Sequence, residues 1–307
     1  MKLSRRNFLA QSALLFSAAT LRPPFMLAQS NQPAAIKPTF HLFTKIFVGL
    51  PYAEIAKQVA DLGYDGVEVP IRKKEILEGT NVLEEIPKMV EAYRKEKLQV
   101  LTLTTDIIEV SRATQTEEIL RTAQKCGLKH FRMGWYRYDN TKPIWPQLDS
   151  FRGKFHDLIT LAKEIGIQPI YQNHSGAKMA GAGIWDIALL MKDYPLSDVA
   201  WAFDMMHAKV EGGLSWPTQF ALARERLAVV QFKNYVWENN LPKSVSLASG
   251  IVNKESVDVL KRIGYAGPCL IHNEYLKGDI NQPDFLASVI KASKDDLVTL
   301  QSWWKTF

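Results

Sequence analysis

The feature that most constrains the fold of this chain is a regular alternation of short apolar runs with segments of helical periodicity. Eight apolar runs alternate with eight helical segments between residues 41 and 304. Glycine follows several helical segments directly, and glycine ends helices readily because it adopts positive φ without strain. The four clearest boundaries read Leu62-Gly63-Tyr64, Cys126-Gly127-Leu128, Ile165-Gly166-Ile167 and Ile263-Gly264-Tyr265. This repetition predicts βα units and a parallel sheet.

The number of units predicts a closed (β/α)8 TIM barrel in one domain, because such barrels take about 250 residues. The expected strands are 41–47, 65–70, 99–105, 130–135, 168–173, 199–204, 228–233 and 268–274. The expected helices are 52–62, 83–97, 117–125, 151–165, 184–192, 218–226, 255–263 and 283–304. A doubly wound open sheet is the alternative, but no glycine-rich phosphate-binding loop follows the first strand.

The N-terminal segment has the composition of an export signal. Ser4-Arg5-Arg6-Asn7-Phe8-Leu9 precedes a short apolar run, and small residues follow near Ala28. Paired arginines before such a run resemble a twin-arginine signal, and the run is too short to span a membrane. We therefore expect a signal peptide over residues 1–28, a linker over 29–37 and a catalytic barrel over 38–307. The twin-arginine translocase would be a transient partner, and the mature protein would be periplasmic, with no stable membrane span.

The charge and the cysteines argue against two classes of function. The net charge is +6, but four basic residues and no acid lie in the predicted signal, so the mature chain would carry +2. The remaining lysines and arginines are dispersed, so no nucleic-acid partner is expected. Cys126 and Cys269 are too few for a disulfide framework and are expected as small core residues.

Polar side chains gather where the predicted strands end. In a barrel of parallel strands these ends meet at one rim, where active sites form. Three of the six histidines fall at such positions, together with acids, bases and amides. The candidates are Lys45, Glu68, Asp106, Arg132, Gln172, Asn173, His174, Asp204, His207, Gln231, Lys233, Asn234, His272 and Glu274. We therefore expect a functional cleft at this rim.

Aromatic residues follow the same strand ends and indicate a carbohydrate ligand. Trp135 follows the fourth predicted strand, Trp216 the sixth and Trp237 the seventh. Ring faces beside hydrogen-bonding groups suit a sugar, which presents C–H faces and hydroxyls. The loops after strands seven and eight contain no phosphate-binding motif, which favours an unphosphorylated sugar. No nucleotide cofactor is expected.

Several motifs resemble those of the sugar phosphate isomerase/epimerase family, the xylose isomerase-like barrels. The similar segments are Gly63-Tyr64-Asp65-Gly66-Val67-Glu68, Tyr171-Gln172-Asn173-His174-Ser175-Gly176, Asp204-Met205-Met206-His207-Ala208 and Gly264-Tyr265-Ala266-Gly267-Pro268. The resemblance covers most of residues 40–307 and is closest to an exported branch of the family. Motifs similar to those of that branch are Asn173-His174-Ser175-Gly176, Glu211-Gly212-Gly213-Leu214-Ser215-Trp216 and His272-Asn273-Glu274-Tyr275.

The resemblance implies a divalent metal site. The family holds its metal with a glutamate on strand five, an aspartate on strand six, a histidine on strand seven and a glutamate on strand eight. The corresponding residues here are Gln172, Asp204, Gln231 and His272, so only the aspartate is retained. Neutral amides bind a divalent cation more weakly than a carboxylate or an imidazole. A site for Mn, Mg, Co or Zn on these four residues and a metal-free pocket are both open at this point.

The resemblance also implies an isomerase or epimerase that removes a proton next to a carbonyl group of a free sugar or keto-sugar. This step needs a base and a group that stabilises the developing oxyanion. The candidate catalytic residues are His174, His207, Lys233, Glu274 and Glu68, and the candidate substrate-binding residues are Lys45, Arg132, Asn173, Trp135, Trp216 and Trp237.

Two alternatives start from the same residues. A lyase that eliminates the aglycone of 3-keto-glycosides begins with the same proton abstraction. A non-catalytic sugar-binding barrel would account for the two glutamines at ligand positions. DNA-repair endonucleases of the same superfamily need several histidines and acids around a metal cluster, and neither this residue set nor the charge favours that function.

Overall fold

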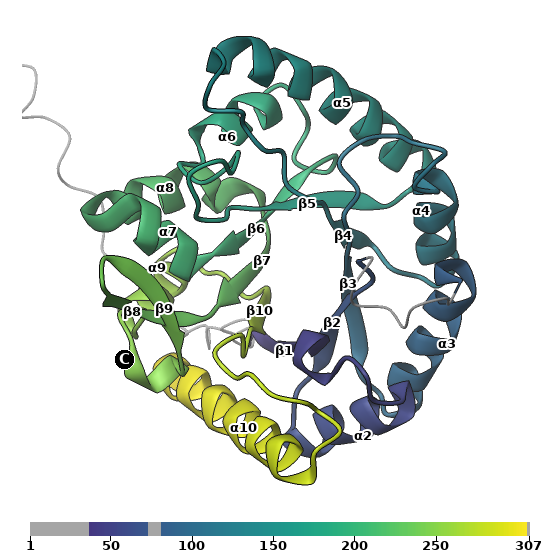
Figure 1. The fold of residues 1–307 in the computed structure, drawn as a ribbon, viewed down its shortest axis with the longest axis vertical. Coiled ribbons are helices and arrows are strands. Elements are labelled where there is room, and N and C mark those ends of the chain that lie inside the picture. The colour runs from purple at the N-terminus through teal and green to yellow at the C-terminus, as the bar shows by residue number, and fades with distance from the viewer. Residues whose placement is uncertain (1–36, 73–80, 306–307) are drawn as a thin grey trace, which may run out of the picture. The chain divides into compact units, whose positions relative to one another are not determined.

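The computed structural model describes residues 37–72 and 81–305, and within them eight parallel strands close into a barrel (Figure 1). The order around the barrel is β1-β10-β7-β6-β5-β4-β3-β2, and the predicted TIM barrel is confirmed. The strands are Thr39–Phe43 (β1), Gly66–Pro70 (β2), Gln99–Thr104 (β3), His130–Arg132 (β4), Gln168–Gln172 (β5), Ala200–Asp204 (β6), Leu227–Phe232 (β7) and Pro268–Ile271 (β10). The predicted signal peptide, and the linker except Lys37, lie outside the described residues.

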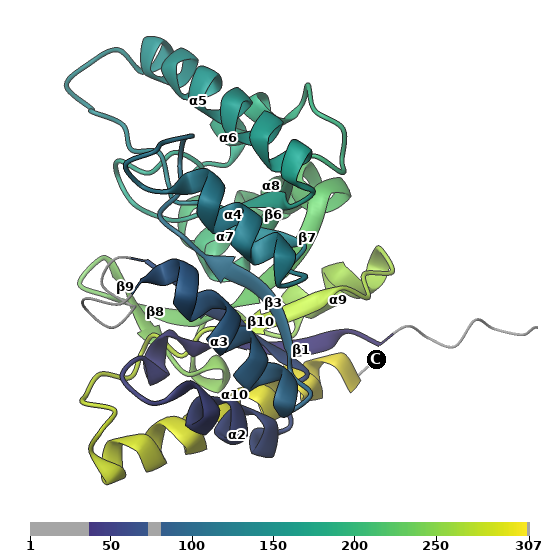
Figure 2. The same cartoon turned by 90° about the vertical axis from the view of Figure 1, so that its right-hand side faces the viewer.

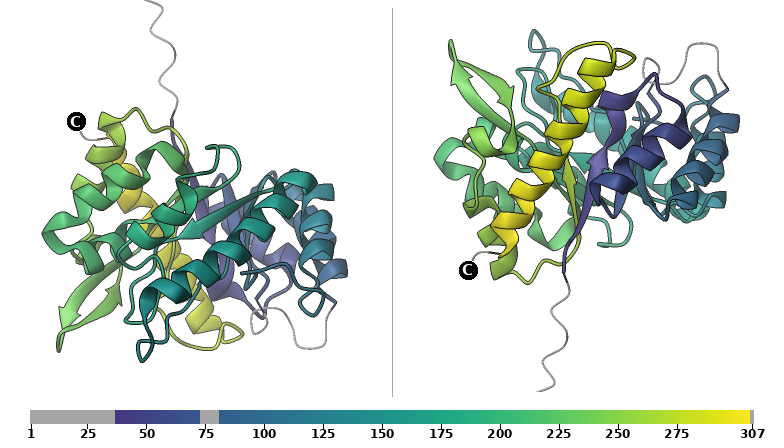
Figure 3. Two further views of the ribbon diagram at one scale, coloured as in Figure 1. Left: turned by 90° about the horizontal axis from the view of Figure 1, so that it is seen from above. Right: turned by 90° about the horizontal axis from the view of Figure 1, so that it is seen from below.

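Helices surround this barrel (Figures 1 and 2). The α-helices are Tyr52–Leu62 (α2), Val82–Lys95 (α3), Thr116–Lys125 (α4), Ile144–Ile165 (α5), Trp185–Met191 (α6), Met205–Gly212 (α7), Trp216–Ala223 (α8), Glu255–Arg262 (α9) and Pro283–Lys305 (α10). Short 3-10 helices are Thr44–Phe47 (η1), Gly213–Ser215 (η2), Arg224–Arg226 (η3) and Leu247–Ser249 (η4). Helix α10 packs beside α2, so the last helix completes the ring next to the first (Figure 3). No helix in the described ranges is both long and apolar enough to cross a membrane.

The helix boundaries follow the predicted glycines. Gly63 and Gly166 cap α2 and α5 in the left-handed conformation, with φ of 88° and 83°. The largest difference in a helix boundary is at the start of α5, which begins at Ile144 and not near residue 151. Pro146 lies in the first turn of this helix, where a missing N–H breaks no helical hydrogen bond, so it does not end the helix.

The elements that the sequence did not predict lie at strand ends. The first strand ends at Phe43, so Lys45 lies on η1 and not on a strand. Helix α7 begins directly after β6. An antiparallel hairpin of β8 (Asn234–Glu238) and β9 (Leu241–Val245) follows β7, and it turns at Asn239 and Asn240, whose φ values are 51° and 59°. In Figure 2 this hairpin lies at the left, at the end of the barrel toward which the parallel strands run.

The barrel interior is apolar below this end. Strand side chains alternate between the two faces, so residues two apart point the same way. A buried cluster of six residues fills the interior: Leu101, Ile170, Ala200, Ala202, Val229 and Leu270. The free cysteines behave as predicted, since Cys269 is buried and Cys126 is partly buried.

Candidate active site

Polar side chains replace apolar ones at the last inward-facing positions at the ends of four strands. On each strand a buried apolar residue is followed two positions later by a buried polar one. The pairs are Ile170 and Gln172 (β5), Ala202 and Asp204 (β6), Val229 and Gln231 (β7), and Leu270 (β10) with His272, which directly follows that strand. The alternation of the strand therefore carries all four side chains to the same end of the barrel, above the apolar cluster.

Glu68 and Arg132 form a buried ion pair on the β2–β4 side of this site. Their side chains are 0% and 2% exposed, and Arg132 Nε lies 2.7 Å from Glu68 Oε1. The Thr104 hydroxyl, at the end of β3, also donates to Glu68 Oε1. Burial alone would raise the pKa of Glu68, but the charge of Arg132 and the hydrogen-bond donors around the carboxylate lower it to about 2. Glu68 is therefore a carboxylate at neutral pH.

Two glutamines connect this ion pair to Asp204. Gln172 Oε1 accepts a hydrogen bond from Arg132 Nη1, and Gln172 Nε2 donates to Asp204 Oδ2 at 2.9 Å. Gln172 Nε2 also donates to Gln231 Oε1, and Gln231 Nε2 donates to Glu68 Oε2 at 3.2 Å. The amide orientation of Gln172 is determined at both ends, because a guanidinium only donates and a carboxylate only accepts.

Lys233 is the second buried cation of the site. It is 5% exposed, and its Nζ lies 3.3 Å from Asp204 Oδ2 and 3.1 Å from Glu274 Oε2. Burial opposes the charged form, but the two carboxylates outweigh it and raise the pKa of Lys233. The Lys233 ammonium in turn holds the pKa of Glu274 well below its usual range. Lys45, which is 43% exposed, approaches the other oxygen of Glu274 at 3.6 Å.

His174 and His207 lie against each other, with ring centroids 3.9 Å apart. Asp204 caps α7 by accepting a hydrogen bond from the backbone N–H of His207 at 3.1 Å. The His207 ring also lies near the Asp204 carboxylate. His174 Nδ1 lies 2.9 Å from the Ser175 carbonyl, which can only accept, so Nδ1 carries the proton in the neutral ring. Burial and the nearby Lys233 charge lower the pKa of His174 to about 4. Neutral His174 therefore presents Nε2 as a lone pair.

Three buried imidazole nitrogens in the site have no hydrogen-bond partner among the described residues: His207 Nε2, His272 Nδ1 and His272 Nε2. His207 Nε2 is 3.7 Å from Asp204 Oδ2, and the His272 nitrogens lie 3.7 Å from Glu68 and 4.0 Å from Glu274. These separations are too long for hydrogen bonds. Burial lowers the pKa of both rings, so both are neutral at pH 7. Buried polar atoms normally have partners, so these nitrogens are available to bond water or the polar atoms of a ligand.

A cavity of about 360 Å³ adjoins this group of residues. Phe43, Lys45 and Glu274 line one part of it, and residues from Leu276 to Asn281 line the other. The Phe43 ring packs against His272 with centroids 4.6 Å apart. Since Glu274 also binds Lys233, the cavity wall directly contacts the charged part of the site. Its volume falls within the range of small-molecule sites, about 300–1,000 Å³.

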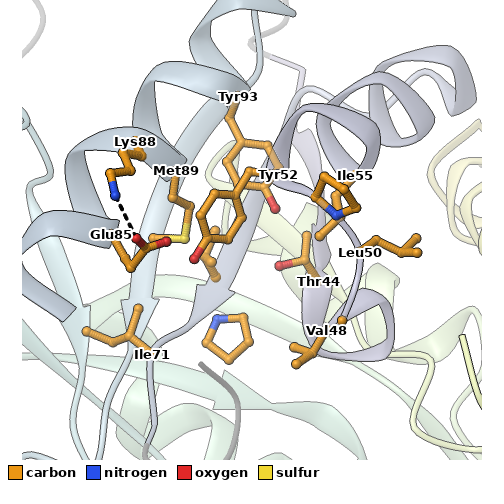
Figure 4. Close-up of a pocket in the computed structure, with 14 residues that line it drawn as sticks. Thr44, Val48, Leu50, Tyr52, Ile55, Ile71, Glu85, Lys88, Met89 and Tyr93 are labelled. Atoms are coloured by element: carbon orange, nitrogen blue, oxygen red, sulfur yellow. Dashed lines mark hydrogen bonds and ion pairs between the residues drawn. The ribbon is translucent and has the colours of Figure 1, made fainter. Parts of the chain in front are cut away.

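A second cavity, of about 500 Å³, lies between α2 and α3 (Figure 4). Its lining is largely apolar and includes Met89, Tyr52 and Tyr93. The polar groups that line it include Glu85 and Lys88, which pair with each other at 3.0 Å. None of the candidate catalytic residues lines this cavity, so we place the active site at the strand ends.

The expected substrate-binding residues divide into two groups. Trp135 packs against His174 with ring centroids 4.7 Å apart and lies under the Arg132 guanidinium at 5.4 Å. Asn173, in contrast, bonds the backbone of Asp204 through both ends of its amide, so it positions the end of β6.

Two further tryptophans have other surroundings. Trp216 is 6% exposed and packs against the Lys209 ammonium at 4.2 Å. Trp237 is 52% exposed on the β8–β9 hairpin, where it packs edge-on against Tyr235. Of the three predicted tryptophans, the contacts of the described residues bring only Trp135 against the histidines.

The four residues predicted as metal ligands do not fit a divalent ion in this arrangement. Oxygens of Gln172, Gln231 and Asp204 already accept hydrogen bonds from Arg132 or from amide groups of the site. Within residues 37–72 and 81–305, no three side chains of His, Cys, Asp or Glu converge as a ligand set. The metal remains an expectation from the resemblance, and no chemistry is derived from it here.

Three residues of the site were not predicted. Thr104 contacts Glu68, Ser175 Oγ lies 2.8 Å from His207 Nδ1, and the Arg72 guanidinium lies 5.7 Å from the Trp135 ring. Thr104 ends β3, so the rule that strand ends carry function could have found it. Ser175 lies within the quoted Asn173-His174-Ser175-Gly176 motif, but nothing in the sequence paired it with His207.

Comparisons with known proteins agree with this fold. The protein family described as "Xylose isomerase-like TIM barrel" matches residues 56–291. No curated protein matches the sequence. Among solved structures, a xylose isomerase domain protein from Planctomyces limnophilus is 15% identical, with a TM-score of 0.66, and the match covers 88% of this chain and 98% of that chain.

Two solved epimerases are similar to the same extent. A 3-keto-D-glucoside 4-epimerase from E. coli is 16% identical, with a TM-score of 0.62, and the match covers 87% of this chain and 100% of that chain. A D-psicose 3-epimerase is 13% identical, with a TM-score of 0.63 and coverage of 85% and 97%. At these identities the likeness shows the fold alone.

Proposed function

The chain belongs to the xylose isomerase-like TIM barrel family, and from this premise we propose that it is a sugar isomerase or epimerase. It removes a proton next to a carbonyl group of an unphosphorylated sugar or keto-sugar and returns it at the same or the neighbouring carbon. The names of the similar structures, 3-keto-D-glucoside 4-epimerase and D-psicose 3-epimerase, support this class of reaction.

The observation that carries the proposal is the group of unpartnered polar atoms at the strand ends, next to Glu274, which also lines the 360 Å³ cavity. Three imidazole nitrogens of His207 and His272 lack partners, and the Lys233 ammonium has three hydrogens for two carboxylate neighbours. A ligand rich in hydroxyl and carbonyl oxygens satisfies such atoms, and an apolar ligand leaves them unpaired at a cost.

His174 is the base in this proposal. Its Nδ1 hydrogen is directed at the Ser175 carbonyl, so Nε2 is the atom that accepts the substrate proton. The Trp135 and His207 rings pack on His174 and hold its orientation. A pKa of about 4 keeps the imidazole unprotonated at neutral pH, although it also limits the basicity of Nε2.

Lys233 donates its third hydrogen to the oxygen on which negative charge develops. A charged donor already held in a water-poor site stabilises an oxyanion without reorganisation. Glu274 binds Lys233 and lines the cavity, so it is placed to exchange protons with the substrate as well. Glu68 differs, because both of its oxygens accept hydrogen bonds from the protein, and we assign it the role of holding Arg132.

The proposal includes export of the enzyme to the periplasm. It is supported by Arg5 and Arg6 before the short apolar run and by the small residues near Ala28. The lyase alternative shares the proton abstraction and differs in the fate of the carbanion. Reprotonation places deuterium on the carbon, whereas elimination forms a double bond and releases the aglycone, which the same NMR spectra detect as a new product.

The test is proton exchange in deuterated water. The full chain is incubated with a panel of ketohexoses, aldoses and 3-keto-glycosides, and NMR follows deuterium entering the carbon next to the carbonyl. We expect exchange with at least one unphosphorylated sugar, and we expect His174→Gln to lower its rate by about 10²–10⁴-fold, the range for loss of a general base.

His156→Gln is the matched control, because His156 lies exposed on α5 and contacts Tyr194. It should retain the exchange rate. Sugar binding without exchange, measured by calorimetry, would establish the non-catalytic barrel in place of the enzyme. Full exchange in the His174→Gln variant would reject His174 as the base.

A further inference from the structure

We infer that the ammonium group of Lys233, and not a divalent metal ion, supplies the positive charge at the centre of this site. Lys233 lies directly after β7 and is almost fully buried. What this charge does for a substrate rests on the proposed function, but its position rests on contacts within the protein alone.

Lys233 occupies the place between two carboxylates that a cation would bridge. Its Nζ is 3.3 Å from Asp204 Oδ2 and 3.1 Å from Glu274 Oε2. Asp204 ends β6 and Glu274 follows β10, so β7, which lies between these two strands in the barrel, delivers the lysine to the gap. A metal ion coordinated by both oxygens would lie in contact with the ammonium group, which repels it.

The amide group of Gln172 also takes a role that a metal ion would have in the family's site. Where the family resemblance places a glutamate, Gln172 donates from Nε2 to Asp204 Oδ2 at 2.9 Å. A carboxylate at that position would face Asp204 with like charge and would need a cation between them. The amide removes this need, because it donates to Asp204 at one end and accepts from Arg132 at the other.

The charges of the site also balance without a metal. Three carboxylates, Glu68, Asp204 and Glu274, face three cationic side chains, Arg132, Lys233 and Lys45. Buried charges persist when each has a partner of opposite sign. A divalent ion would add two positive charges to a set that is already neutral.

The consequence for chemistry is a different kind of electrophile. An ammonium group is a compact charge with movable hydrogens, and here two of its three hydrogens face carboxylates. The third can donate to a substrate oxygen as charge develops on it. The enzyme therefore needs no added metal for proton abstraction, and chelators leave it active.

Metal binding by the full-length protein tests the inference without reference to activity. Metal content is measured by elemental analysis after purification. Melting temperatures are compared with and without about 1 mM Mn²⁺, because a ligand in excess of its dissociation constant stabilises the native state that binds it. We expect less than about 0.1 metal ion per chain and no rise in melting temperature, since an ion that does not bind the native state cannot stabilise it. Stoichiometric metal, or stabilisation of the wild type by Mn²⁺, overturns the inference.

The Lys233→Ala variant reverses the expectation. It removes the ammonium group between Asp204 and Glu274 and leaves only the partly exposed Lys45 beside Glu274, so Mn²⁺ should now bind and raise the melting temperature by about 3 °C or more. Lys45→Ala is the control, because Lys45 is 43% exposed and lies 3.6 Å from the Glu274 oxygen that Lys233 does not contact. It should gain no response to Mn²⁺, and an equal gain in both variants contradicts a central role for Lys233.

The two proposals fail separately in these experiments. A wild-type protein without metal and without proton exchange retains the lysine inference and loses the sugar reaction. Exchange that disappears with a chelator and returns with Mn²⁺ retains the reaction and loses the inference. If Lys233→Ala does not fold, the metal content and the Mn²⁺ response of the wild type still test the inference.

Discussion

Arg132 is the residue on which most of the polar contacts of the site depend. Its guanidinium meets Glu68, Thr104 and Gln172, and it is 2% exposed. Removal of one partner of a buried pair leaves an uncompensated charge, which costs about 3–5 kcal/mol. We therefore expect Arg132→Met to lower the free energy of unfolding by this amount, measured by urea denaturation.

The control for this prediction is an arginine with equally short contacts at the surface. Arg121 lies 2.7 Å from Glu117 and 2.9 Å from Glu164, with all three side chains well exposed. Water screens such pairs, so Arg121→Met should have a far smaller effect. If the two variants lose a similar free energy of unfolding, burial is not the reason why the Arg132–Glu68 pair stabilises the fold. A Glu68→Gln change added to Arg132→Met should recover part of the loss.

The sequence identified most of these residues but not how they contact one another. Gln172, Asp204, Gln231 and His272 were found because each ends a predicted strand. Their hydrogen-bond partners depend on side-chain rotamers and on distances across the barrel, which no spacing within one strand encodes. The sequence therefore did not decide whether a metal binds, whereas the structure shows that the amide oxygens of Gln172 and Gln231 already accept hydrogen bonds.

At the scale of elements, the pairing of β1, β2 and β3 depends on a close approach at Gly66. A Cβ added there would lie 2.2 Å from the Gln99 carbonyl oxygen and 2.8 Å from His41 Nδ1. Since the first of these atoms belongs to the neighbouring backbone, the strands would have to separate. We expect Gly66→Ala to destabilise the barrel by about 2–4 kcal/mol, measured by chemical unfolding.

Gly153 provides the opposite case within α5. No atom lies within 4 Å of a Cβ added at this position, and the residue is exposed in a helix interior. Gly153→Ala should stabilise the protein by about 0.5–1 kcal/mol, because alanine favours the helix and glycine does not. If Gly66→Ala were tolerated as well as Gly153→Ala, the tight contact between the strands would be disproved.

Elements with strong periodicity were predicted well, and elements that depend on a turn were missed. Helix α2 has the predicted bounds, because its apolar spacing and its terminal glycine agree. The β8–β9 hairpin was missed, although Asn239-Asn240 suits a turn in which both residues have positive φ. Helix α7 was missed for two reasons. It has no clear apolar face, and its N-cap is Asp204, a residue that was predicted as a metal ligand.

At the scale of the whole molecule, burial of histidine makes the fold sensitive to acid. Five of the six histidines have a lowered pKa, and burial is the largest cause for each. His41, inside the barrel, and His174 both fall to about 4. The unfolded chain binds protons at these rings near pH 6.5, and the folded chain does not. Their contribution to stability is therefore complete above about pH 6.5 and is lost as the pH falls toward 4.

The carboxyl groups with shifted pKa values, which also titrate in acid, give the same sign with one exception. Glu68 and Glu274 have lowered pKa values, so the stability that they contribute is also lost as the pH falls, below about 4.5. Asp296 acts in the opposite direction, since burial raises its pKa to about 6 and the fold gains a proton that the unfolded chain releases. One carboxyl group does not offset five imidazoles, so the net effect of acid is destabilising.

We expect the free energy of unfolding, measured with urea at pH 7.5, 6.5, 5.5 and 4.5, to change little above pH 6.5 and to fall steeply below it. His41 alone accounts for about 2 kcal/mol of the fall by pH 5, from a shift of its pKa to about 4. His41→Leu should reduce the slope of this curve, and His156→Gln should not, because His156 is exposed. A curve that stays flat between pH 6.5 and 4.5 would mean that the fold accommodates charged imidazoles, and the neutral His174 on which the proposed proton abstraction depends would then lose its support.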